Sequence, residues 1–337
     1  MLMTFLVVLA GSVVRMTGSG MGCPDWPKCF GLLIPPTDAE AVTWRAGEVY
    51  TQGRMLVARD TLWVAQSEIL ASDFESERED GAWLPYDRHD YAVFNPVHTW
   101  VEFINRLLGA LTGIPAMVLF GWTLLRAVRH RSWPPFVWAA VHLCWLGLVA
   151  WLGKKVVDGN LIPFSITLHM LGALAILISL LGMLRSVSGA LRAQAMPMVA
   201  SSKSWLRVAL FFAVMQLVIG TQVREQIDAL NHAGILRSDW LGNLPDWWKW
   251  HRSGSWAVLF LQLAWIWPLW NHLPSRKFGD LGTAPRMALM LVIAQMLSGI
   301  VFVWADMPAY LQPMHLLLAV GLILTNVWAW MHHRMVA

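Results

Sequence analysis

Eight apolar runs, each close to the length of a membrane-crossing helix, constrain this chain more than any other feature. A helix needs roughly 20 mostly apolar residues to cross a bilayer. Of the 337 residues 57% are hydrophobic and 14% are charged, a balance unlike that of a soluble globular protein. We therefore predict an all-α polytopic membrane protein with eight transmembrane helices. The runs lie at about residues 1–17, 97–125, 136–153, 166–185, 206–223, 251–271, 286–304 and 313–331.

Basic side chains predict how these helices are oriented. The short connections 126–131, 185–207 and 276–286 are rich in Arg, and positively charged loops stay in the cytoplasm. An even number of spans then places both termini in the cytoplasm and the long segment 18–95 on the outer face. We expect the inner membrane of a bacterium, and we interpret the acidic stretch 73–80 as solvated and partly flexible.

A short pattern occurs twice along the chain. Residues 11–15 read GSVVR and residues 220–224 read GTQVR, each at the end of an apolar run. Each copy is followed in later runs by an arginine and then by a histidine, Arg106 and His169 after the first copy and Arg252 and His315 after the second. The repeat predicts two pseudo-symmetric four-helix bundles, an N-terminal half over residues 1–190 and a C-terminal half over residues 200–337.

The first apolar run is short, because it begins at Met1 and meets Arg15. At 1.5 Å per residue such a helix spans about 21 Å. A cleaved signal peptide is one explanation, but the run lacks a basic start and cleavage near Ala10 would destroy the first copy of the repeat. A start codon placed too late is the explanation that we favour.

Three histidines lie within or at the end of apolar runs, where ionisable groups are costly. His251 and His315 have similar depth in the C-terminal half, and His169 has the depth of His315 in the N-terminal half. Facing histidines of a four-helix bundle are typical axial ligands of haem, whereas zinc would need further ligands. We predict a bis-histidine haem site on His251 and His315, with helix packing as the alternative for each histidine.

Arginines accompany these histidines. Arg252 follows His251, and Arg106 occupies the matching position in the N-terminal half. Adjacent helical residues point about 100° apart, so each arginine would flank a haem pocket, where propionates would be its partners. Snorkelling to the membrane interface is the alternative. The same two interpretations apply to Arg15 and Arg224, at the outer ends of their runs.

The repeat is broken at one position, since the N-terminal half has Asn105 where the C-terminal half has His251. His98, Glu102 and Asn105 lie on one helix face at i, i+4 and i+7. A carboxylate within a membrane helix is costly unless it is paired or used. Glu102 could accept a proton from an oxidisable substrate, or it could pair with Arg106 four residues on. The sequence leaves both open.

Two cysteines enclose five residues of the outer segment, Cys23 and Cys29. An oxidising compartment would permit a structural disulfide between them. A redox-active pair is the second interpretation, because Lys28 beside Cys29 would favour thiol exchange. Metal binding is a third, although a closed site needs four ligands.

Taken together, these motifs resemble the haem A synthase family. The resemblance extends over almost the whole chain in the right order, and the cysteine-bearing motif is its most specific part. The residues that carry it are 11–29, 102–106 (EFINR), 168–172 (LHMLG), 220–224, 251–252 (HR) and 314–315 (MH).

The resemblance implies an oxidoreductase that converts the C8 methyl of haem O into the formyl group of haem A through two successive hydroxylations. A haem b cofactor would be held by His251 and His315, with Arg252 and Arg224 beside it. The substrate haem would bind in the N-terminal half, where Glu102 would lie near the reacting methyl. The other residues implied at the substrate site are His169 as iron ligand, His98, Asn105, Arg106, Arg15, Cys23 and Cys29.

Asn105 departs from the family motif, which has a second iron ligand there. Either His169 alone holds the substrate iron, or His98 ligates a haem shifted toward the outer surface, since His98 lies about 10 Å away along the helix. We favour the first. His98 would then lie at the pocket mouth, paired with Glu102.

The expected partners are haem O, membrane lipid and an electron-transfer partner of unknown identity, with no nucleic acid. Haem O synthase, cytochrome oxidase assembly factors and a second copy of the chain are further candidates. Two other functions fit the same motifs. One is a b-type membrane cytochrome that only passes electrons, and the other is a non-catalytic haem carrier or assembly factor.

Overall fold

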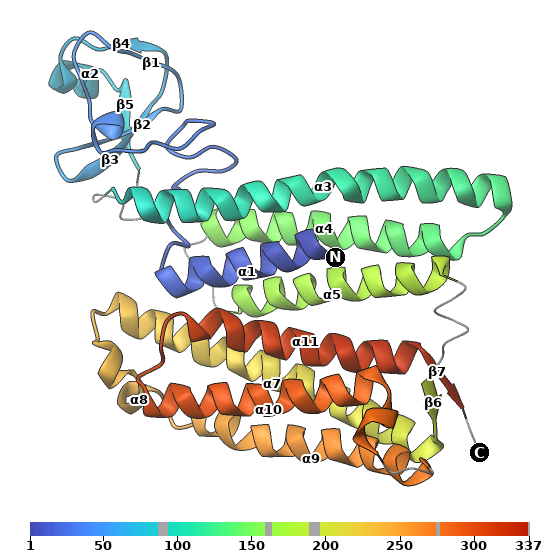
Figure 1. The fold of residues 1–337 in the computed structure, drawn as a ribbon. Helices are drawn as coiled ribbons and strands as arrows, with labels where there is room; N and C mark the ends of the chain where they lie inside the picture. Colours follow the sequence, from blue (N-terminus) through green and yellow to red (C-terminus); the bar gives the residue numbers. More distant parts are fainter. Residues whose placement is uncertain (87–93, 159–163, 189–195, 274–276, 336–337) are drawn as a thin grey trace. The chain divides into compact units, whose positions relative to one another are not determined.

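The computed structural model describes residues 1–86, 94–158, 164–188, 196–273 and 277–335, and most of these are helical (Figure 1). Every predicted apolar run overlaps a helix. The long helices are α1 (Leu2–Thr17), α3 (Pro96–His130), α4 (Pro134–Asp158), α5 (Ser165–Val187), α7 (Ala200–His232), α9 (Trp248–His272), α10 (Thr283–Trp304) and α11 (Leu311–Met331).

Six helices of the described residues are long and apolar enough to cross a membrane: α3, α4, α5, α7, α10 and α11. The chain is therefore built as an integral membrane protein. Of the other two, α1 has 16 residues, and α9 has 25 residues but is not among the six. The count of eight spans stays a prediction.

Several helices extend beyond the apolar runs, so the predicted helix ends were wrong. Helix α7 continues past Arg224 to His232, and an ion pair of 2.6 Å between Arg224 and Asp228 lies on that extension. Pairs at i, i+4 stabilise a helix even where it is polar. Helix α3 begins at Pro96, which places Asn105 within the helix and not at its start.

Contacts divide the chain into two compact units, each described here by itself. The first contains residues 1–8, 112–149 and 166–337, and the second contains residues 9–111 and 150–165.

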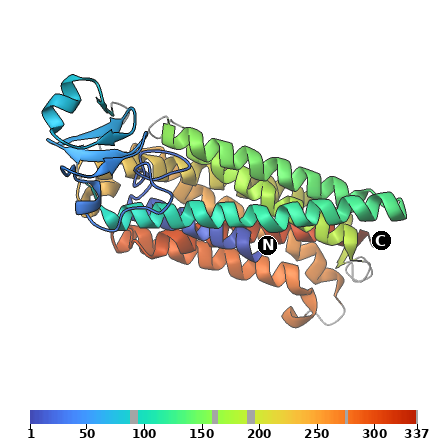
Figure 2. The same cartoon turned by 90° about the horizontal axis from the view of Figure 1, so that it is seen from above.

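In the first unit, α7 packs along α9 and α10 packs along α11 (Figure 1, Figure 2). Trp265 and Leu206 are fully buried in the core that these helices share. A second core joins α5 to α7 and α11, where Leu177 packs with Leu217 and Ile323. The short elements of this unit are β6 (Met196–Met198), paired in parallel with β7 (His333–Met335), and η2 (Arg237–Asp239), α8 (Trp240–Asn243) and η3 (Phe278–Leu281).

The second unit holds a small folded region within the predicted outer segment. Antiparallel pairing joins β1 to β4, and β2, β3 and β5 form a three-stranded sheet in that order. The elements are η1 (Glu40–Val42), β1 (Val49–Tyr50), β2 (Met55–Ala58), β3 (Thr61–Ala65), β4 (Ile69–Leu70), α2 (Phe74–Glu79) and β5 (Trp83–Pro85).

The acidic stretch, interpreted from the sequence as solvated and partly flexible, contains helix α2 of this folded region, and short strands accompany the mostly helical fold. Asp73 caps α2 by accepting from the backbone amides of Glu75 and Ser76. Phe74 and Trp83 are buried in a shared apolar core. The carboxylate of Glu77 accepts from the indole nitrogens of Trp83 (3.0 Å) and Trp44 (3.2 Å). Buried aromatic residues between the charges therefore order the stretch.

Candidate functional site

The two histidines predicted to share a metal face each other in the structure. His251 lies in the first turn of α9 and His315 in the first turns of α11. Their ring centroids are 6.4 Å apart and their planes are inclined by 69°. Metal–imidazole bonds are about 2 Å long, so this spacing suits two rings that share one ion. Nδ1 of His251 is buried, and among the described residues it has no hydrogen-bond partner.

The hydrogen-bonded neighbours of His315 are consistent with a proton on Nδ1. The Ser298 hydroxyl donates to the carbonyl of Gln295 at 2.8 Å, so its oxygen is left to accept from Nδ1–H of His315 at 2.7 Å. The lone pair of Nε2 then accepts from the Gln295 amide at 2.9 Å. His315 is thus prepared to ligate a metal through Nε2.

Close packing around His251 depends on a glycine of the repeat. A Cβ atom added to Gly220 would lie 2.8 Å from Cε1 of the His251 ring. The side-chain amide of Gln216 donates to the backbone carbonyl of His251. The Phe302 ring centroid lies 5.0 Å from that of His315. Helices α7, α9, α10 and α11 therefore all contribute to this site.

The two arginines predicted beside the cofactor have protein partners in this structure. Arg224 donates to Gln312 and to Asp228, both at 2.6 Å. Arg252 is exposed, and its guanidinium lies 5.2 Å from the ring centroid of Trp248. Sequence reasoning missed Gln312 and Asp228, although Asp228 follows Arg224 at the i, i+4 spacing of a helical ion pair.

The donor set of this site fits haem better than zinc. Two imidazoles suffice for an iron whose other four ligands come from a porphyrin. A structural zinc site needs four protein ligands, and no group of three or more His, Cys, Asp or Glu side chains forms in the part of the chain that the structure describes. His251 and His315 therefore fit a haem with two histidine ligands.

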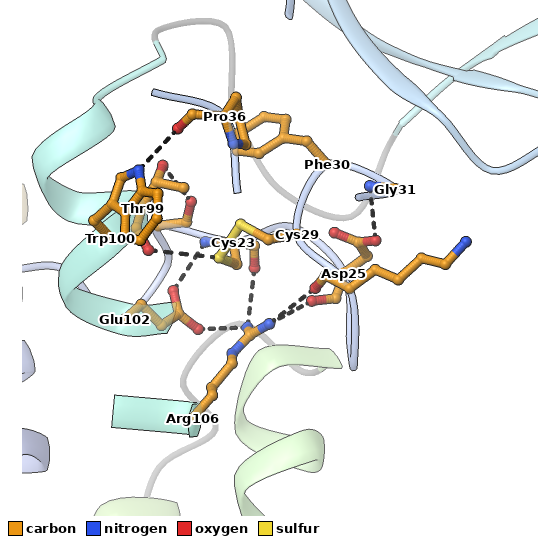
Figure 3. Close-up of a disulfide and its surroundings, with 12 residues drawn as sticks. Cys23, Asp25, Cys29, Phe30, Gly31, Pro36, Thr99, Trp100, Glu102 and Arg106 are labelled. Carbon is orange, nitrogen blue, oxygen red and sulfur yellow. Dashed lines mark hydrogen bonds and ion pairs between the residues drawn. A yellow bond between two sulfur atoms is a disulfide. The ribbon is translucent and has the colours of Figure 1, made fainter. Parts of the chain in front are cut away.

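Cys23 and Cys29 form a disulfide in the second unit (Figure 3). Both are fully buried. Arg106 on α3 holds the loop that the disulfide closes, because its guanidinium donates to the carbonyls of Asp25 (2.6 Å), Lys28 (3.2 Å) and Cys23 (3.2 Å). The disulfide loop is thus attached to the helix that carries Glu102.

Glu102 points at the same loop (Figure 3). Its carboxylate accepts from the backbone amide of Cys23 at 2.9 Å and forms an ion pair of 2.5 Å with Arg106. Only 4% of Glu102 is exposed. The predicted pair with Arg106 is therefore present, whereas among the described residues no hydrogen bond joins His98 to this carboxylate.

Further contacts of the disulfide loop were not predicted. Thr99 donates to the carbonyl of Gly22 at 2.9 Å, and Tyr86 donates to the carbonyl of Pro24 at 2.6 Å. A Cβ on Gly22 would overlap the backbone of His98. Gly22 in a Gly-rich motif was the one sequence signal for this close approach.

The broken copy of the repeat has the same local arrangement as the intact one. A Cβ added to Gly11 would lie 3.6 Å from Oδ1 of Asn105, just as one on Gly220 would meet His251. Within the described residues, this Oδ1 has no hydrogen-bond partner although it is buried. The glycine therefore faces the residue at which the two halves differ.

The remaining residues predicted for the substrate site lie on three helices. His169 is in the first turns of α5, and its Nδ1 is buried without a partner among the residues that the structure describes. Arg15 lies in the last turn of α1, and His98 lies one turn before Glu102 on α3. His169 belongs to the first compact unit, and the other three to the second.

A polar contact joins α5 to α7 beside two of these histidines. The hydroxyls of Thr167 and Thr221 are 2.7 Å apart, and Gln222 donates to Thr167 at 2.7 Å. Thr167 is two residues before His169, and Thr221 follows the glycine that packs on the His251 ring. The two candidate ligand sites are therefore connected by a hydrogen-bonded helix pair.

These helices and the facing imidazoles define an integral membrane protein with a candidate haem site. The family model described as cytochrome oxidase assembly protein matches residues 1–57 and 84–327, and the chain belongs to this family. Residues 58–83, which include β3, β4 and α2, lie outside the match.

Curated relatives carry one common name. The chain is 26% identical to a heme A synthase of Sphingopyxis alaskensis, over 99% of this chain and 89% of that protein. It is 24% identical to one of Novosphingobium aromaticivorans, over 97% of this chain and 91% of that protein. A heme A synthase of Shewanella oneidensis is 25% identical over 72% of this chain, and the match spans only 60% of its length. No solved structure matches the chain.

Proposed function

We propose that this chain is a haem A synthase, an oxidoreductase that converts the C8 methyl of haem O into the formyl group of haem A. The observation that carries the proposal is the facing pair of His251 and His315, 6.4 Å apart, in a member of the cytochrome oxidase assembly protein family. The name shared by its relatives supports the same reaction.

The proposed architecture has eight transmembrane helices in two pseudo-symmetric four-helix bundles, over residues 1–190 and 200–337. This architecture is supported by a repeated contact: Gly11 packs against Asn105 in one half, and Gly220 packs against His251 in the other. The protein would lie in the bacterial inner membrane with both termini in the cytoplasm and residues 18–95 outside. Basic short connections support that orientation.

His251 and His315 would hold haem b as the resident cofactor in the C-terminal half. Haem b supplies one-electron redox chemistry when bound. Ser298 would keep His315 oriented, and the glycine at 220 would leave room for the His251 ring. Arg224 and Arg252 would pair with the propionates, which requires Arg224 to exchange Asp228 or Gln312 for a propionate oxygen.

Haem O would bind in the N-terminal half with His169 as its iron ligand. Asn105 would not serve as a second ligand, since an amide is a poor iron ligand. His98 at the pocket mouth is the alternative second ligand. Arg106 and Arg15 are assigned to the same substrate site.

The reaction removes hydrogen from one carbon in two stages. Each hydroxylation replaces a C–H bond by a C–OH bond; with water supplying the oxygen, it releases two electrons and two protons. The gem-diol formed by the second hydroxylation loses water to leave the aldehyde. Glu102 would accept a proton released at this carbon. Arg106 and the Cys23 amide would hold its carboxylate in place, and Cys29 would fix Cys23 through the disulfide. An electron-transfer partner would take up the electrons.

Mass analysis of the haems extracted from the purified chain tests this proposal. Haem b together with haem O or haem A is the expected result. Haem b alone would overturn the synthase and favour a b-type cytochrome or a haem carrier. Haem O synthase and cytochrome oxidase assembly factors are the proposed protein partners, within membrane lipid and without nucleic acid, and self-association is also proposed.

A further inference from the structure

The hydroxyl of Ser298 is committed to His315. Ser298 is only 7% exposed, and its own proton goes to the carbonyl of Gln295 at 2.8 Å. Its oxygen therefore accepts from Nδ1–H of His315, which is 2.7 Å away. A metal-bound histidine whose other nitrogen donates to an acceptor is a stronger and better-oriented ligand.

Gln295 cannot provide this support, although it also bonds to His315. Its amide donates to Nε2, the nitrogen whose lone pair an iron would need. Haem binding at Nε2 must therefore displace the Gln295 amide, whereas the Ser298 bond at Nδ1 can remain. Ser298 is thus the one of these two side chains that is compatible with a ligated His315.

We propose that Ser298 is the positioning residue that makes the haem on His251 and His315 a resident group. The proposal rests on the proposed function for the role of this haem. Loss of such a hydrogen bond typically lowers metal affinity about 10-fold to 100-fold.

Two variants of the full-length, detergent-purified chain loaded with haem b test the role of Ser298. Ser298→Ala is expected to speed haem loss to an excess of a haem-scavenging protein by about 10-fold to 100-fold. It is also expected to raise the midpoint potential of that haem, because a weaker donor stabilises ferric iron less. Ser298→Thr keeps the acceptor and is expected to behave as wild type.

The midpoint potential of the haem distinguishes a positioning role of Ser298 from a merely structural one. A Ser298→Ala variant with unchanged potential and unchanged haem loss would overturn the proposal, even if its melting temperature fell. A threonine variant that loses haem as fast as the alanine variant would overturn it too. Neither readout requires haem A formation, so the inference and the proposed reaction fail independently.

Discussion

The imidazole rings of His251 and His315 face each other with centroids 6.4 Å apart, although 64 positions separate them in the sequence. Close packing of α7 with α9 and of α10 with α11 brings them together. Gly220 packs against the ring of His251, and Ser298 forms a hydrogen bond with the ring of His315. The packing of these helices thus places the two rings opposite each other.

Replacement of either facing histidine is expected to abolish stable haem b binding, because a single imidazole leaves one axial position of the iron to water. His251→Ala should therefore be purified with less than about a tenth of the haem of wild type, because loss of even an outer-shell partner of a metal ligand lowers affinity about 10-fold to 100-fold. Haem per protein, measured by absorbance, checks this. His232→Ala, an exposed site on α7, is the control. Equal haem content in His251→Ala and wild type would contradict the assignment.

Gly220→Ala is expected to weaken haem binding by crowding the His251 ring, since the added Cβ would lie 2.8 Å from Cε1. Overpacking of this kind costs about 1–3 kcal/mol. The repeat offers a matched control in Gly11→Ala, whose Cβ would lie at an ordinary 3.6 Å from Asn105. Titration of both variants with haem b measures whether Gly220→Ala alone lowers the affinity for haem. If both retained wild-type affinity, the close packing would have no role in the site.

Some of this site could be predicted from the sequence, and the reasons for the rest are physical. His251, His315 and the spacing of Glu102 and Arg106 stood out because charged or ionisable groups are rare within apolar helices. Ser298 and Gln295 did not, because small polar residues are common in membrane helices and only the rotation of α10 shows which ones face His315.

The outer region was predicted least well. Its charges suggested a solvated stretch, but the structure shows Glu77 as a buried acceptor for two indoles and Phe74 in an apolar core. Short strands such as β1, with two residues, carry almost no periodic signal. Only long-range contacts of Trp83 and Tyr50 define that fold.

Arg106→Ala is expected to destabilise the disulfide loop strongly. It would leave the buried Glu102 carboxylate without its ion pair. It would also remove the hydrogen bonds that the guanidinium donates to the carbonyls of Cys23, Asp25 and Lys28. Breaking a buried pair in this way costs about 3–5 kcal/mol. Denaturant unfolding in detergent measures the loss, and Glu102→Gln with Arg106→Ala completes a double-mutant cycle. Strictly additive effects would show that the two side chains do not interact.

The outer region is expected to lose stability in acid because of Glu77. Burial alone would raise the pKa of Glu77, but hydrogen bonds from Ser72, Trp83 and Trp44 outweigh burial and hold this pKa below its ordinary value. A carboxylate with a depressed folded-state pKa stabilises the fold above its unfolded-state pKa. That stability is lost as the pH falls through the folded-state value.

Intrinsic fluorescence of Trp83 and its neighbours against pH measures this loss. Glu77→Gln should lower stability near neutral pH and flatten the acid transition, since the glutamine side chain does not titrate. Glu79→Gln, an exposed position on the same helix, should keep the wild-type profile. An acid transition that persists unchanged in Glu77→Gln would contradict the role of this carboxylate.

The most direct test of the proposed function follows the substrate itself. The full chain is produced in membranes supplied with haem O but lacking any other haem A synthase, and the haems are extracted and identified by mass. The account predicts haem A from the wild type, and haem b with unreacted haem O from Glu102→Ala. Recovery of haem O without haem A from the wild-type chain would contradict it.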